Sequence, residues 1–140
     1  MRFRVWILAL LTLPAISWAN APVDVDGDWT LDSVPCDDGT MGEKRYETVG
    51  LSISGDLISA VLVKDGCEIT IEGIVQMDGN ILSAEFASGS WTACSGAMPT
   101  YVLNRFEAAR TDETLELSGT DLTPFGSCKG KSGKLVFKGE

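Results

Sequence analysis

The chain of 140 residues contains no histidine. Histidine is the side chain that most often acts as a base near neutral pH, so its absence excludes Ser-His and Cys-His nucleophile pairs. No serine elbow and no cluster of metal-ligating side chains is evident in the sequence. We therefore predict that the protein is not an enzyme and holds no cofactor or metal.

Basic residues are also scarce, with 11 Lys and Arg against 20 Asp and Glu. A chain this acidic repels nucleic acid and anionic lipid headgroups, so we exclude both as default partners. We interpret the excess of Asp and Glu as a charged, well-solvated surface.

No apolar run is long enough to cross a bilayer, which requires about 20 residues. The longest run, residues 5–13, follows Arg2 and Arg4 and precedes the small-residue site Ser17-Trp18-Ala19. This order is typical of a secretory signal peptide over residues 1–19, cut before Asn20. An uncleaved N-terminal anchor is the alternative, and we expect no stable insertion of the mature chain into a membrane.

Removal of residues 1–19 leaves 140 − 19 = 121 residues, 20–140, which suits one secreted or periplasmic domain. Both basic residues of the leader are arginines, so 11 − 2 = 9 Lys and Arg remain against 20 Asp and Glu, a net charge of −11.

Four cysteines remain: Cys36, Cys67, Cys94 and Cys128. An even number in a small exported domain predicts two disulfides. Zinc sites use closely spaced ligand pairs, whereas these cysteines are 31, 27 and 34 residues apart. Two pairings stay open: Cys36–Cys67 with Cys94–Cys128, or Cys36–Cys128 with Cys67–Cys94.

Short segments rich in Ile, Val and Leu dominate the mature chain, and no helical pattern of ten residues occurs. The clearest are four consecutive segments separated by Gly55-Asp56, Asp65-Gly66 and Asp78-Gly79-Asn80. Asp-Gly and Gly-Asp pairs between such segments are strong hairpin signals. The predicted strands are residues 28–33, 48–54, 57–64, 67–77, 81–87, 101–109, 114–120 and 134–138.

Eight antiparallel strands in one small domain predict an all-β, up-and-down barrel that closes by pairing the last strand with the first. A β-sandwich is the alternative. Counting strand reversals places the three long connections and all four cysteines at one end of the barrel. Four large apolar residues fall in these connections, either as a binding surface or as a plug of the core: Met41, Trp91, Met98 and Phe125.

The mature chain resembles the lipocalin-like barrels of the calycin group. Gly27-Asp28-Trp29 matches their Gly-x-Trp at the first strand, and Thr111-Asp112 matches the start of their Thr-Asp-x-x-Tyr motif. Lys138 takes the place of the basic residue that packs over the tryptophan. The resemblance implies a lipocalin-like barrel in which these residues support the fold. The chain departs from the family where Leu115 stands near the place of the motif tyrosine.

Two functions from different classes fit these features. The first is a binder of a small apolar or amphipathic molecule, held in the lumen or at the disulfide-braced end. The candidate lumen lining, which alternatively just fills the barrel, is Leu51, Ile53, Ile69, Ile71, Val75, Leu82, Phe86, Tyr101, Leu103 and Leu117. The second is a module that binds a secreted protein partner, such as a protease inhibitor acting through residues 88–100.

Overall fold

The computed structural model describes residues 22–92 and 101–139, and these residues form strands and loops. The strands are β1 (Gly27–Ser33), β2 (Glu43–Lys44), β3 (Thr48–Ser54), β4 (Leu57–Lys64), β5 (Cys67–Asp78), β6 (Ile81–Thr92), β7 (Tyr101–Arg110), β8 (Thr114–Gly119), β9 (Gly126–Ser127) and β10 (Gly133–Gly139). Within these ranges no helix is long and apolar enough to cross a membrane.

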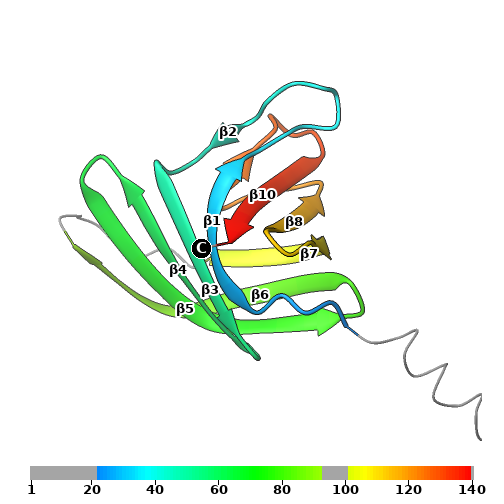
Figure 1. The fold of residues 1–140 in the computed structure, drawn as a ribbon. Coiled ribbons are helices and arrows are strands. Elements are labelled where there is room, and N and C mark those ends of the chain that lie inside the picture. The colour runs from blue at the N-terminus through cyan, green and yellow to red at the C-terminus, as the bar shows by residue number, and fades with distance from the viewer. Residues whose placement is uncertain (1–21, 93–100, 140) are drawn as a thin grey trace, which may run out of the picture.

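Eight strands form a closed antiparallel barrel in the order β1-β10-β8-β7-β6-β5-β4-β3 (Figure 1). Consecutive long strands pair with each other, and β1 closes the barrel between β10 and β3. The predicted up-and-down barrel is therefore confirmed, and the sandwich alternative is wrong. Closure leaves no free edge along the paired part of the wall.

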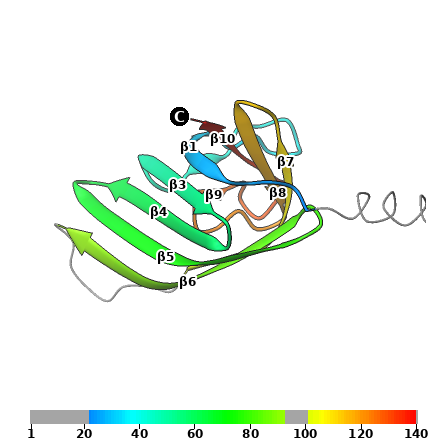
Figure 2. The same ribbon diagram turned by 60° about the horizontal axis from the view of Figure 1, so that its bottom comes forward.

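The barrel has two different ends. The tight-turn end carries the connections 55–56, 79–80 and 111–113. The loop end carries the connections 34–47, 65–66 and 120–132, and β2 and β9 form a small separate sheet within two of them. The strands β4, β5 and β6 project together on the left of the barrel, beyond β1 and β10 (Figure 2).

The strand β6 is longer than predicted and reaches Thr92 instead of Ala87. Its extension, rich in Ser and Gly, pairs with the first residues of β5, for example Ile69 with Trp91. Small polar residues lack the apolar alternation of a strand, so the sequence pattern ended early.

A β-bulge divides β7. Ser83 of β6 stands opposite both Asn104 and Arg105, and Arg105 adopts φ 60°. The extra residue reverses the alternation, so Leu103 and Phe106 both face the interior. This explains why neither alternating face of the predicted strand was fully apolar.

The barrel interior is hydrophobic, and no polar or charged side chain of the described residues is buried. Its largest fully buried side chains are Phe106, Phe125 and Phe137. Each fully buried aromatic or Leu side chain stabilises the fold by about 1.5–3 kcal/mol relative to exposure. The interior is therefore the main source of stability.

Candidate functional site

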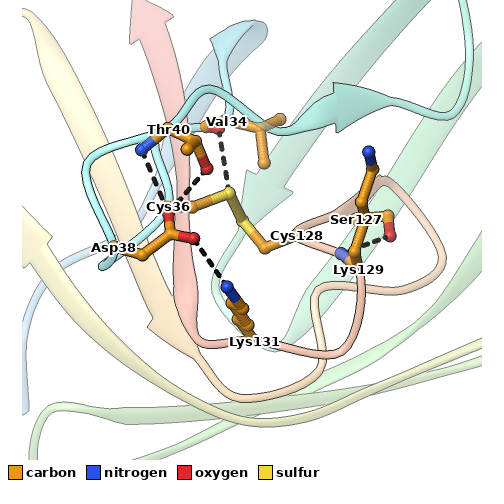
Figure 3. Close-up of a disulfide and its surroundings, with 8 residues drawn as sticks. All are labelled: Val34, Cys36, Asp38, Thr40, Ser127, Cys128, Lys129 and Lys131. Carbon is orange, nitrogen blue, oxygen red and sulfur yellow. Dashed lines mark hydrogen bonds and ion pairs between the residues drawn. A yellow bond between two sulfur atoms is a disulfide. The ribbon is translucent and has the colours of Figure 1, made fainter.

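A disulfide joins two long connections at the loop end (Figure 3). Cys36 and Cys128 are 92 residues apart in sequence, with an S–S distance of 2.03 Å. The bond confirms disulfide formation and is compatible only with the second predicted pairing. The other half of that pairing includes Cys94, which lies outside the described residues. A disulfide of this kind indicates an oxidising, extracytoplasmic environment.

The connections around the disulfide are held by backbone pairing as well. Glu43 pairs with Ser127 and Lys44 with Gly126, forming the β2–β9 sheet. Gly133 leaves room for the disulfide, because a Cβ there would lie 2.6 Å from the Cys128 Sγ. The two connections therefore form one braced layer over the barrel end.

Asp38 anchors the turn beside the disulfide (Figure 3). Its Oδ1 accepts hydrogen bonds from the Thr40 amide at 3.0 Å and the Thr40 hydroxyl at 2.6 Å, and Lys131 Nζ lies 3.0 Å from its Oδ2. The Thr40 hydroxyl, followed by the Thr40 amide and Lys131, lowers the pKa of Asp38 below its ordinary value. These contacts hold the carboxylate charged in a structural role.

Phe125 comes from the connection between β8 and β10 but lies inside the barrel. Its ring makes edge-on contacts with Phe86 and Phe137, each at a centroid distance of 6.4 Å. Arg45 donates its amide hydrogen to the Phe125 carbonyl at 2.9 Å, which fixes this connection to the segment before β3. Phe125 therefore plugs the barrel as part of its core and does not contribute its ring to a binding surface.

The candidate lumen residues all lie on the inner side of the wall. Leu82, Leu103 and Leu117 are 0% exposed. Five others are between 1% and 3% exposed: Leu51, Ile53, Ile71, Val75 and Phe86. Ile69 and Tyr101 are partly buried and pack against this core. The interior around these side chains is therefore packed.

Two tyrosines meet near the mouth of the barrel. The hydroxyls of Tyr46 and Tyr101 are 2.8 Å apart, which links the segment before β3 to the start of β7. Burial, together with the hydrogen bond to Tyr101, raises the pKa of Tyr46 above its ordinary value of 10.0. Tyr46 also lines a surface hollow, so its ring belongs both to the core edge and to the loop-end surface.

Two hollows open on the loop end. One, of about 740 Å³, is lined by Glu43, Lys44, Arg45, Tyr46, Glu47, Lys64, Asp65 and Ser127. The other, of about 320 Å³, lies over the disulfide and is lined by Cys36, Asp38, Thr40, Met41, Gly42, Glu43, Ser127, Cys128, Lys129 and Lys131. Glu43 and Ser127, paired across β2 and β9, line both hollows. Together they form what we call the loop-end surface.

The four apolar loop-end candidates do not lie together in one surface of the described structure. Met41 is 66% exposed and lines the smaller hollow, whereas Phe125 is in the core. The side chain of Trp91 and the whole of Met98 lie outside the described part. Sequence reasoning missed Tyr46 and the charged residues around it, although an aromatic residue at the end of a polar connection was a usable signal.

The residues compared with lipocalins lie at the tight-turn end. A Cβ on Gly27, which has φ 146°, would lie 3.2 Å from the Trp29 ring. The Thr111 hydroxyl accepts the Thr114 amide at 3.1 Å and closes the turn, in which Asp112 is exposed. The cation over Trp29 is Arg110, 5.0 Å from the ring centroid.

The prediction that Lys138 is the basic residue over Trp29 is therefore wrong. Leu135 and Phe137 of β10 face inward, so Lys138 faces outward and lies 3.6 Å from Asp32.

The described residues contain no group of three or more His, Cys, Asp or Glu side chains that could hold a metal ion. The residues that line the loop-end surface offer hydrogen-bonding groups, charges of both signs and one exposed apolar side chain. Comparisons with protein-family models, with curated proteins and with solved structures found no match.

Proposed function

We propose that this protein is an exported, lipocalin-like barrel that binds a secreted protein partner through its loop-end surface. The observation that carries the proposal is the position of Phe125. This ring packs edge-on against Phe86 and Phe137. The inner side chains of Leu82, Leu103 and Leu117 are 0% exposed, so the described residues leave little room for a ligand inside the barrel. Binding then falls to the braced surface outside.

The chemistry of the loop-end surface favours a protein over an apolar small molecule. Its larger hollow is wide and lined by charges of both signs, including Lys44, Arg45 and Glu47. Small-molecule sites are mostly apolar and enclosed, whereas protein interfaces combine a polar rim with a few apolar or aromatic anchors. Met41 and Tyr46 supply such anchors.

A secreted protease is the partner class that the sequence suggested, acting through residues 88–100. Residues 93–100 lie outside the described part, so our proposal is carried by the connections 34–47 and 120–132. The second candidate function is binding of a small amphipathic molecule at the barrel mouth. It is favoured by the Tyr46–Tyr101 hydroxyl pair, two partly buried side chains that pack against the core.

A photo-crosslinking amino acid at position 41 tests the proposal in the full chain. Asp112 is the control, because it is exposed like Met41 but lies in a turn at the opposite end of the barrel. We expect one covalent protein adduct, formed in the native secretions, from position 41 and none from position 112. Equal adducts from both positions would overturn the proposal. A bound small molecule in native mass spectrometry, without an adduct, would support the second candidate instead.

A further inference from the structure

A row of exposed apolar side chains crosses the outer face of the barrel. Among the described residues, the exposed large hydrophobic side chains are Met41, Leu57, Ile74 and Val102. Three of these four lie in one row, because Leu57 pairs with Ile74, Ile74 with Glu85, and Glu85 with Val102. The row spans four strands, or about 14 Å at the usual strand spacing. Scattered exposed apolar residues need no explanation, but three in one row, interrupted only by Glu85, indicate a contact surface.

The surface beside this row is hollowed. A shallow groove of about 190 Å³ is lined by Ile74, Gln76, Ser83, Ala84, Glu85, Val102, Leu103 and Asn104. It follows the β6–β7 seam next to the bulge, where Ser83 faces two residues of β7. Ile74 and Val102 are 47% and 50% exposed on either side of the Glu85 carboxylate. This arrangement matches a side chain with an aliphatic stem and a cationic end.

Charge decides what binds there. Glu72 and Glu85 are both exposed on the outer face of β5 and β6, and no Lys or Arg is among the residues that line the groove. Arg105 lines an adjoining hollow together with Asp78. A second copy of this chain would bring the same exposed glutamates against those of the first. The two copies would also repel each other, because each has a net charge of −9, or −11 after removal of the leader. Anionic lipid is repelled for the same reason. A basic partner satisfies both the apolar row and the carboxylates.

We propose that the Leu57–Ile74–Glu85–Val102 row is a docking surface for a basic, partly apolar polypeptide segment. A lysine or arginine of that segment lies in the groove, with its stem on Ile74 and Val102 and its cation on Glu85. Apolar side chains on either side of it cover Leu57 and the outer edge of the row. This surface lies on the barrel wall and is separate from the loop-end surface.

The test uses an acetylated, amidated seven-residue peptide of alternating valine and lysine, added to the isotopically labelled full chain. We expect amide chemical-shift changes centred on Ile74, Glu85 and Val102. Glu85→Gln should weaken peptide binding at least about fivefold, because the cation loses its partner beside an apolar surface. Val102→Ser should weaken it to a similar degree.

Glu107→Gln is the control, since Glu107 is an exposed acid on β7, the strand that also carries Val102. It should change the affinity less than about twofold, the effect expected of a remote, screened charge. Equal weakening by Glu85→Gln and Glu107→Gln would reduce the effect to general attraction and overturn the proposal. So would equal binding of the peptide with glutamate in place of lysine, or shifts at the row that depend on protein concentration without peptide.

Discussion

Arg110 connects the N-terminal segment to the barrel through one cation–π contact and two hydrogen bonds. Its guanidinium lies over the Trp29 ring, and its Nη1 donates to the carbonyls of Asp24 at 3.0 Å and Asp26 at 2.8 Å. The Trp29 Nε1 in turn donates to the Val25 carbonyl at 3.1 Å. The Arg110 guanidinium and the Trp29 indole thus hold the segment before β1 against the core at the tight-turn end of the barrel.

We expect Arg110→Ala to lower the free energy of unfolding by about 1–2 kcal/mol, from the lost cation–π contact and charge-assisted hydrogen bonds. Lys138→Ala should cost less than about 0.5 kcal/mol, because its ion pair with Asp32 is exposed. Urea unfolding of the two variants measures both values. A loss as large for Lys138→Ala as for Arg110→Ala would contradict the assignment of Arg110 as the structural cation.

Tyr46 and Tyr101 are the only two tyrosines of the chain, so tyrosinate absorbance reports on this pair alone. Because burial raises the pKa of Tyr46, the folded chain keeps a phenolic proton that the unfolded chain loses. The associated stability is fully present below the unfolded pKa, near pH 10, and is lost as the pH rises toward the folded pKa.

An absorbance titration should therefore show clearly less tyrosinate in the folded chain at about pH 11, where the tyrosines of the urea-unfolded chain are about nine-tenths ionised. Tyr46→Phe should remove the late part of the folded titration. Superimposable curves for the folded and unfolded chains would contradict the buried hydrogen-bonded pair.

A β-bulge interrupts the pairing of β5 and β6 at Gly73. Glu72 pairs with Ser88 and Gly73 with Phe86, so Ala87 is an extra residue in β6. A Cβ built on Gly73 would overlap the Glu85 carbonyl. The glycine therefore allows the bulge to form and the wall to bend at this level.

Gly73→Ala should destabilise the barrel by about 2 kcal/mol or more, because the strands must separate to admit the methyl group. Gly50→Ala is the matched control in β3, where the nearest atom to the added Cβ is 4.0 Å away. We expect it to be neutral within about 0.5 kcal/mol or slightly stabilising, since alanine restricts the unfolded chain. Thermal unfolding of both variants, followed by circular dichroism, compares them. Similar melting temperatures would show that the bulge does not need glycine.

For the molecule as a whole, the order and closure of the barrel could be predicted because alternation and turn residues are local signals. Segments ending at Ser54, Lys64 and Ala109 were bounded by residues that tolerate tight turns, and each of the eight barrel strands lies where the pattern placed it to within a few residues, except β6. The placement of Cys36, Cys67 and Cys128 at one end followed from the same strand count.

Other features depend on contacts that no local pattern contains. The β2–β9 sheet consists of two-residue strands without alternation, and the bulge at Arg105 turns Phe106 inward against the pattern. Arg110 rather than Lys138 covers Trp29 because the outcome depends on which way each side chain faces. Tyr46 was missed for the same reason, since its partner is 55 residues away.

The burial of Phe125 has a consequence for how rigid the loop-end surface is. Withdrawing this ring from between Phe86 and Phe137 would leave a cavity costing about 3–5 kcal/mol. The connection that carries β9 can therefore not be displaced far without disturbing the core. The loop end is thus preorganised, and a partner that binds there gives up little of its interaction free energy to order the connections 34–47 and 120–132.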